Sequence, residues 1–172
     1  MVGKARQIIV GVLVAMFVAG CAEERPTRRM PSKRDMIEYN RRLVQMDSTC
    51  IVAYSDTAGL NVKPTSSGLW ITIHEEGSGD AVVKGQTVVL AYKISDLLGH
   101  EFYNSQTDGE KVFVAGRGHE VMGLDEGVVG LRKGAKATLL LLPDKAYGLI
   151  GDEKKINGRI ILRYDIEVKD VR

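Results

Sequence analysis

Cysteine and histidine are scarce in this sequence, and their positions exclude several kinds of chemistry. The two cysteines, Cys21 and Cys50, are too few for a disulfide framework. His74, His100 and His119 are scattered, without the i,i+4 or CxxC spacing that zinc sites use. The motifs of a nucleophile elbow and of a phosphate-binding loop are also missing. We therefore expect no metal, no cofactor and no covalent catalysis.

The sequence also lacks an excess of charge of one sign. It has 24 basic and 22 acidic residues, and two of the bases, Lys4 and Arg6, lie in a segment that we predict to be removed. The remaining chain is close to neutral and has no basic surface of the kind that binds nucleic acid. Aromatic residues make up only 6% of the chain, so each is informative. Apolar or neutral polypeptides are the partners that this composition favours.

No apolar run is long enough to cross a membrane. The longest, Ile8 to Val18, has eleven residues, whereas a spanning helix needs roughly 20. With the basic residues before it, the run is typical of a secretory signal peptide, which we place at residues 1–20. The run ends in Phe17-Val18-Ala19-Gly20-Cys21, which resembles the lipobox of bacterial lipoproteins. We expect a lipid on Cys21 to anchor the chain to a membrane of the cell envelope, with the outer membrane favoured; an ordinary signal peptide or a membrane anchor is the alternative.

A helix is predicted after a charged tether at residues 21–31. Ser32 and Asp35 fit a capping box in which Asp replaces the usual Glu. An apolar stripe then recurs every three or four residues, at Met36, Tyr39, Leu43, Met46, Cys50 and Ala53, and it is broadened by Ile37, Val44 and Ile51. We predict a helix from about residue 33 to 55, within an amphipathic segment 32–58. Its stripe packs either on the main domain or on a second copy in a homodimer, and Cys50 is expected to be a small buried residue, with intermolecular pairing or reactivity as the alternative.

After residue 67 the apolar period changes from helical to alternating, which indicates strands. A connection at 61–68 and a turn at 77–79 bracket the first strand, and one short helix is allowed from Met122 to Leu131. The predicted strands are 69–73, 87–94, 101–103, 112–114, 135–142 and 159–168. Antiparallel strands around one short helix predict an α+β domain at residues 67–172.

Sequence motifs in this domain carry a resemblance to a known family. They occur in the family's order at compatible spacing: Ser67-Gly68-Leu69-Trp70, Glu76-Gly77-Ser78-Gly79, Lys84-Gly85-Gln86-Thr87-Val88, Val89-Leu90-Ala91-Tyr92, Gly99-His100-Glu101-Phe102, Gly123-Leu124-Asp125-Glu126-Gly127-Val128, Arg132-Lys133-Gly134-Ala135-Lys136-Ala137, Pro143-Asp144-Lys145-Ala146-Tyr147-Gly148 and Leu162-Arg163-Tyr164-Asp165-Ile166-Glu167. The region from Gly68 to Val171 therefore resembles the FKBP-type peptidyl-prolyl cis/trans isomerases. The resemblance implies an antiparallel sheet half-wrapped around the 122–131 helix, with an apolar cleft between them.

The resemblance also implies an activity and its residues. The expected activity is isomerisation of prolyl bonds in proline-containing polypeptide clients, here exported proteins of the cell envelope. By position in the family, the catalytic residues are Tyr147, whose hydroxyl donates to the bound peptide, with Phe102 and Tyr92. The substrate-binding residues implied in the same way are Phe113, Val121, Leu124, Ile156, Tyr164 and Tyr103.

Several positions depart from the family pattern. Tyr103 replaces an aspartate, Lys111 replaces an aromatic wall residue, and Leu124 replaces the tryptophan that commonly floors the pocket. The late loop reads Ile156-Asn157-Gly158 rather than Ile-Pro-Pro. Two other functions therefore stay open: a catalytically weak or inactive peptide-binding and chaperone module of an envelope complex, and a structural lipoprotein assembled through its N-terminal helix.

Overall fold

The computed structural model describes residues 30–172. The predicted signal peptide, the lipidation site Cys21 and all but the last two residues of the tether lie outside these residues. The chain divides into two compact units, residues 1–38 and residues 39–172. Across residues 30–172, no helix has both the length and the apolarity that crossing a bilayer requires.

The helix α2 (Lys33–Ala58) begins as the sequence predicts. In the first unit, the Asp35 N–H donates to the Ser32 hydroxyl (3.2 Å), and the Ser32 N–H donates to the Asp35 carboxylate (2.9 Å). This reciprocal pair satisfies N–H groups that the first turn of a helix leaves without partners. The hydrogen bond from Ser32 lowers the pKa of Asp35. The capping box is confirmed, and the helix runs without a break three residues past the predicted end.

In the second unit, α2 packs on the sheet through a small apolar cluster and two polar links. Ile51 is fully buried against Leu140 and Leu142. A carboxylate of the helix, Asp47, accepts two hydrogen bonds of 2.8 Å from Arg159. A further hydrogen bond of 2.8 Å runs from Arg163 to the hydroxyl of Tyr54.

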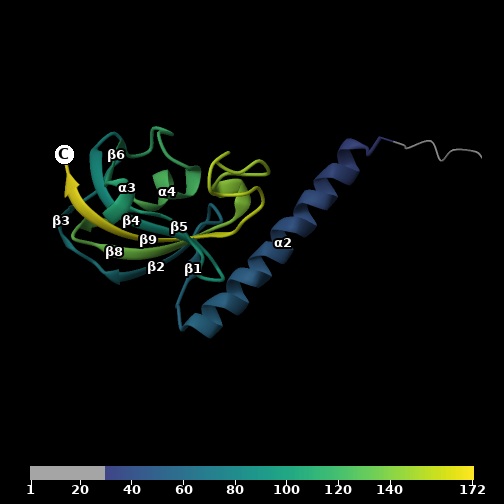
Figure 1. Ribbon diagram of the computed structural model, residues 1–172, viewed down its shortest axis with the longest axis horizontal. Helices are drawn as coiled ribbons and strands as arrows, with labels where there is room; N and C mark the ends of the chain where they lie inside the picture. The colour runs from purple at the N-terminus through teal and green to yellow at the C-terminus, as the bar shows by residue number, and fades with distance from the viewer. Residues whose placement is uncertain (1–29) are drawn as a thin grey trace, which may run out of the picture. The chain divides into compact units, whose positions relative to one another are not determined.

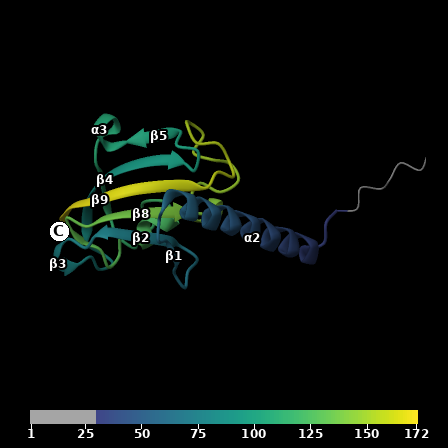
Figure 2. The same cartoon turned by 90° about the horizontal axis from the view of Figure 1, so that it is seen from below.

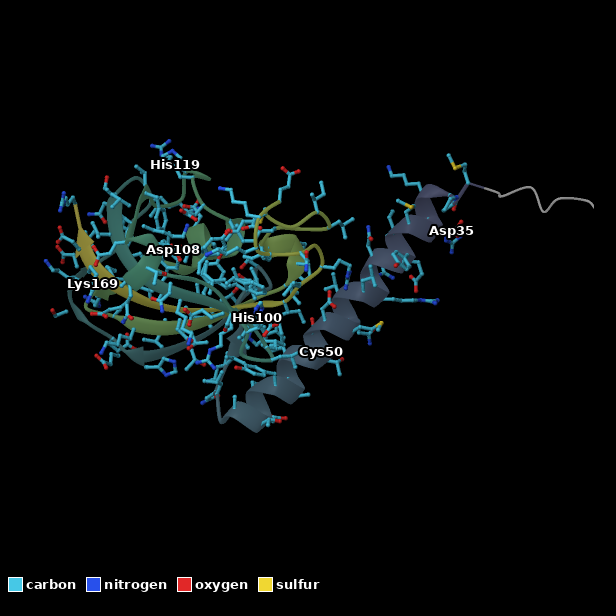
Figure 3. All side chains as sticks on the ribbon, in the orientation of Figure 1. Asp35, Cys50, His100, Asp108, His119 and Lys169 are labelled. Atoms are coloured by element: carbon cyan, nitrogen blue, oxygen red, sulfur yellow. The ribbon has the colours of Figure 1, made fainter. Side chains whose placement is uncertain are left out.

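α2 packs through the broadened side of the predicted stripe and not through its centre. Ile51, one of the residues predicted to broaden the stripe, is buried, about 100° around the helix from Cys50. Cys50, expected to be buried, is exposed (Figure 3), and Met46 is 64% exposed. The prediction for Cys50 was wrong because counting apolar residues gave no weight to Asp47 and Tyr54, whose polar atoms bind arginines beside the apolar contact.

The sheet of the second unit is antiparallel, in the order β1-β2-β8-β9-β4-β5, with β6 also paired to β4. Figure 2 shows β2, β8, β9 and β4 side by side, with β5 beyond β4. The small strands β3 and β7 form a separate pair. The bounds are β1 (Lys63–Pro64), β2 (Trp70–Glu75), β3 (Ser78–Ala81), β4 (Thr87–Asp96), β5 (Glu101–Asn104), β6 (Lys111–Val114), β7 (Arg132–Lys133), β8 (Lys136–Leu141) and β9 (Leu162–Val171).

Alternation along β4 and β9 builds most of the core. Every second residue of each strand is buried: Val88, Leu90, Tyr92 and Ile94 on β4, and Leu162, Tyr164, Ile166 and Val168 on β9. This period of two places one apolar face of the sheet against the helix α4 (Met122–Gly127). In Figure 1 the strands curve beneath α4, which confirms the predicted α+β architecture with one short helix against the sheet.

Two glycines let α4 approach the sheet closely. A Cβ added at Gly123 would lie 2.4 Å from a methyl carbon of Leu141, and one at Gly127 would lie 2.8 Å from a methyl carbon of Leu139. The glycines that weaken the helix propensity are therefore the ones that permit its packing. The helix ends at Gly127, four residues before the predicted end.

Short elements account for the other differences from prediction. Strand β3 begins at Ser78, inside the predicted turn, and β1 lies in the predicted connection. A helical turn, α3 (Ser105–Asp108), and a 3₁₀ turn, η1 (Pro143–Lys145), flank the strands that carry the site. These strands and turns are too short for a period of apolar residues to be recognised in the sequence.

Candidate active site

A hollow of about 420 Å³ opens where β4 and β5 meet the loop after η1. Its size falls in the range of small-ligand sites, which is roughly 300–1,000 Å³. Residues from β4, β5, β6, α3 and the loop surround it. The lining consists of Tyr92, Ile94, Tyr103, Asp108, Lys111, Tyr147, Asp152 and Lys154.

Three of the predicted site residues line this hollow: Tyr92, Tyr103 and Tyr147. Tyr92 is one of the alternating buried residues of β4. Tyr103 on β5 and Tyr147 after η1 are half-buried. Burial raises the pKa of Tyr92, so its hydroxyl stays protonated at neutral pH. The three rings bring hydroxyl groups and aromatic surface together from separate segments.

The other predicted residues lie behind the hollow, in the main apolar cluster. They are Phe102, Phe113, Leu124, Ile156 and Tyr164, all buried, with Val121 partly buried against them. Tyr147 packs on the same cluster as Phe102. These side chains support the lining residues from behind, and the structure places the predicted set in one continuous region.

A hydroxyl without a partner lies in this cluster. The Tyr164 hydroxyl is buried and makes no hydrogen bond that meets standard geometry within the described residues. Burial raises the pKa of Tyr164 well above its usual value, with a smaller effect from the neighbouring Tyr147. A buried phenol that faces another phenol stays neutral and keeps its proton available for a hydrogen bond.

One wall of the hollow is polar and was not predicted. The Tyr103 hydroxyl donates to Oδ2 of Asp152, and this bond raises the pKa of Tyr103 to about 12. Burial by itself raises the pKa of Asp152, but the hydrogen bonds from Tyr103 and from three backbone N–H groups outweigh it and lower that pKa. Asp152 therefore carries a full charge at neutral pH.

Lys111 forms a second charged feature at the rim. Its ammonium group lies 2.8 Å from a carboxylate oxygen of Glu120 and 5.1 Å from the centre of the Tyr92 ring. Both partners of this ion pair are more than three-quarters buried. The lysine that replaces an aromatic wall residue thus still covers an aromatic ring, by a cation–π contact.

The lining corrects one expectation from the sequence. The resemblance implies an apolar cleft, but Asp108, Lys111, Asp152 and Lys154 give the hollow a charged rim around its tyrosines. Asp152 could not be found from the sequence, because it lies in a turn-rich loop 49 positions from its partner Tyr103. The replaced aspartate at position 103 and the lysine at position 111 were the signs in the sequence that the polar groups here are rearranged.

The potential metal ligands in the described part of the chain are dispersed. Among residues 30–172, no three His, Cys, Asp or Glu side chains gather closely enough to hold a metal ion. Figure 3 shows His100 and His119 far apart on the second unit.

Comparisons with known proteins agree with this fold. The sequence model described as FKBP-type peptidyl-prolyl cis-trans isomerase matches residues 79–169. FKBP-type peptidyl-prolyl cis-trans isomerase FkpA of Escherichia coli (strain K12) is 37% identical over 111 residues, which cover 64% of this chain and 40% of FkpA. FK506-binding protein 1 of Gibberella zeae is 35% identical over 109 residues, which cover 60% of this chain and 98% of that protein.

Solved structures give the same picture. The crystal structure of FkpA from Escherichia coli superimposes with a TM-score of 0.63 at 26% identity, over 98% of this chain and 82% of that one. The crystal structure of AtFKBP13 gives a TM-score of 0.59 at 29% identity, over 65% of this chain and 99% of that one. The sequence match thus spans less than half of the length of FkpA, whereas it spans nearly all of the fungal relative.

Proposed function

This chain belongs to the family of FKBP-type peptidyl-prolyl cis-trans isomerases, and we propose on that basis that it interconverts cis and trans X–Pro bonds in exported polypeptides of the cell envelope. The family model matches residues 79–169, and this range includes all three tyrosines of the hollow.

The physics of the reaction suits such a hollow. Amide resonance sets a rotation barrier of about 18–20 kcal/mol, and X–Pro bonds interconvert unaided in tens to hundreds of seconds. Twisting the bond breaks the resonance and reduces its charge separation. A site that removes water and binds the twisted form better than the planar form lowers the barrier without transferring a proton.

The observation that carries the proposal is the convergence of Tyr92, Tyr103 and Tyr147 around one hollow backed by the apolar core. We assign Tyr147 the role of donor to a carbonyl of the bound peptide, with Tyr92 as an aromatic wall that the buried Phe102 supports from behind. Tyr103 contacts the substrate directly. The other predicted substrate-binding residues shape the hollow from the core behind it: Phe113, Val121, Leu124, Ile156 and Tyr164.

A protease-coupled assay on a short X-Pro-Phe peptide tests the activity. The full chain should accelerate isomerisation, and Tyr147→Phe should lower kcat/KM about three- to tenfold, since one hydrogen bond is worth roughly 1 kcal/mol. Tyr39→Phe removes a hydroxyl from an exposed tyrosine of α2 and serves as the matched control. No acceleration at micromolar protein would refute the activity.

A peptide-binding module without turnover is the second candidate, and the charged rim favours it. Lys111 forms an ion pair with Glu120, and Asp152 accepts a hydrogen bond from Tyr103. The rim therefore consists of charged groups with polar partners and not of the apolar surface that desolvates an amide. On this account the chain suppresses aggregation of a proline-free client while it fails the peptide assay. Light scattering of the aggregating client, with and without the chain, separates the two candidates.

The envelope location rests on the first 21 residues of the sequence. A short apolar run that ends in Ala19-Gly20-Cys21 supports export and a lipid on Cys21, with the outer membrane as the favoured site. Incorporation of labelled palmitate into the wild-type chain but not into Cys21→Ser is the expected result. Labelling that persists in Cys21→Ser would contradict the assignment.

An assembly role for α2 belongs to the same proposal. Tyr39 and Met46 are 62% and 64% exposed, and Cys50 lies on the same stripe, so the stripe is open to a second copy of the chain. A homodimer through this face would cover apolar surface that the packing of α2 on the sheet leaves exposed.

A further inference from the structure

One hydrogen bond ties the late loop to β5 across the wall of the hollow. The Tyr103 hydroxyl donates to Oδ2 of Asp152, which is 49 residues away in the sequence. Both side chains line the hollow and are half-buried. The bond therefore joins two segments that lie far apart in the sequence.

Asp152 organises its own loop with its other oxygen. Oδ1 accepts the N–H groups of Lys154 (3.0 Å), Lys155 (3.0 Å) and Ile156 (2.8 Å). The loop is closed at its base, where the Asp152 N–H donates to the Ile156 carbonyl (3.0 Å) and Gly151 pairs with Asn157. The loop is thus a preformed unit, and Oδ2 remains to attach that unit to β5.

Lys155 reinforces the attachment from the same loop. Its ammonium group lies 4.5 Å from the centre of the Tyr103 ring and 3.6 Å from a carboxylate oxygen of Asp108 on α3. Tyr103 is therefore held by its hydroxyl and by its ring face. Lys155 thus connects the loop to Tyr103 of β5 and to Asp108 of α3.

We propose that Tyr103 and Asp152 form a positioning pair that locks the 151–157 loop against β5 and so sets the width of the hollow for an X–Pro segment. This proposal rests on the proposed isomerase function. The pair gives the hollow a fixed, hydrogen-bonded wall in place of the free carboxylate that the family pattern has at position 103. Because the wall contacts the peptide in its planar and twisted forms alike, its loss weakens substrate binding and leaves the turnover rate nearly unchanged.

The first test is Tyr103→Phe in the full chain, which keeps the ring and the three backbone hydrogen bonds of Asp152. KM for an X–Pro peptide should rise about three- to tenfold with kcat within twofold, a change that the loss of a hydrogen bond to a charged group can produce. Amide hydrogen exchange at residues 151–157 should also become faster. Tyr39→Phe should change neither quantity.

A second variant separates charge from shape. Asp152→Asn retains an oxygen that accepts the three N–H groups but removes the charge that holds the Tyr103 proton. In the wild type, carbon-13 NMR of labelled tyrosines should show Tyr103 ionising near its pKa of about 12, and in Asp152→Asn that pKa should move toward the usual 10. Asp144→Asn changes an exposed carboxyl outside the hollow and is the matched control.

The outcomes are distinct from those of the isomerase test. An inactive wild type would refute the proposed reaction, while faster loop exchange in Tyr103→Phe, weaker binding of the X–Pro peptide by NMR and the shifted tyrosine titration would still support the pair. Unchanged loop exchange in Tyr103→Phe, or faster exchange with unchanged KM and peptide affinity, would overturn the proposal, because the pair would then not set the hollow. A fall in kcat at constant KM would overturn it as well.

Discussion

At the scale of single residues, the site depends on side chains that never reach its surface. Leu124 is fully buried in the main core, at the position where a tryptophan commonly floors the pocket in the family. Its neighbours in that cluster include Phe102 and Tyr164, which lie behind the lining tyrosines. A defect at Leu124 therefore affects the hollow through packing.

Leu124→Ala should lower the free energy of unfolding by about 3 kcal/mol, since it removes buried methyl groups and leaves a cavity. Leu149→Ala is the control: the same substitution at a 75% exposed position should stay within about 0.5 kcal/mol of the wild type. Urea unfolding followed by circular dichroism gives both values. Equal effects at the two positions would show that Leu124 is not part of the packed core.

Asp170 gives a prediction about pH. A hydrogen bond from Lys133, with a second from Arg172, lowers the pKa of Asp170 to about 2, below its ordinary value of 3.8. A carboxyl with a depressed pKa in the folded state contributes stability above the ordinary pKa and loses it as the pH falls through the lower one. The stability difference between the wild type and Asp170→Asn should therefore be constant above pH 4 and vanish between pH 4 and pH 2, as measured by urea midpoints. A difference that grows toward low pH would contradict the assignment.

At the scale of elements, α2 contacts the sheet mainly around one residue, Ile51. Ile51 fills a small cluster with Leu140 and Leu142, flanked by the bonds of Asp47 and Tyr54 to arginines. Neighbouring helix residues, such as Val52, are exposed. Shortening the side chain of Ile51 should therefore release the C-terminal half of the helix from the sheet.

Ile51→Ala should lower stability by about 2–4 kcal/mol and accelerate amide exchange along residues 43–58, because it empties the apolar cluster. Val52→Ala changes the adjacent residue, which is 43% exposed, and should leave both quantities nearly unchanged. Hydrogen exchange with mass spectrometry resolves the helix from the sheet. Equal exchange in the two variants would refute a helix anchored at Ile51.

The elements also show what the sequence could and could not predict. Alternation predicted β4 and β9, and a period of 3.6 predicted α2, because each pattern follows from the geometry of its own element. The packed face of α2 was misjudged at Cys50, since that choice depends on Arg159 and Arg163, more than 100 residues further along the chain. The partner of Tyr103 was missed for the same reason, because nothing local to Asp152 indicates β5.

At the scale of the whole molecule, the exposed stripe of α2 predicts self-association. If a second copy covers Tyr39 and Met46, Met46→Asp places a charge in the interface and should convert a dimer into a monomer. Gln45→Asp adds the same charge at an exposed polar position and should leave the dimer intact. Light scattering of the full chain in detergent measures the mass. A monomeric wild type would exclude assembly through this face.

Under the proposed function, the hollow between Tyr103 and Tyr147 catalyses rotation of a prolyl bond. The most direct measurement is NMR exchange spectroscopy of a short X-Pro peptide, with the full chain present and its Tyr92, Tyr103 and Tyr147 resonances assigned. We predict exchange cross-peaks between the cis and trans peptide signals, together with shifts of all three tyrosines that saturate at the same peptide concentration. Tyrosine shifts without exchange cross-peaks would make the hollow a binding site alone, and cross-peaks without those shifts would place the reaction elsewhere.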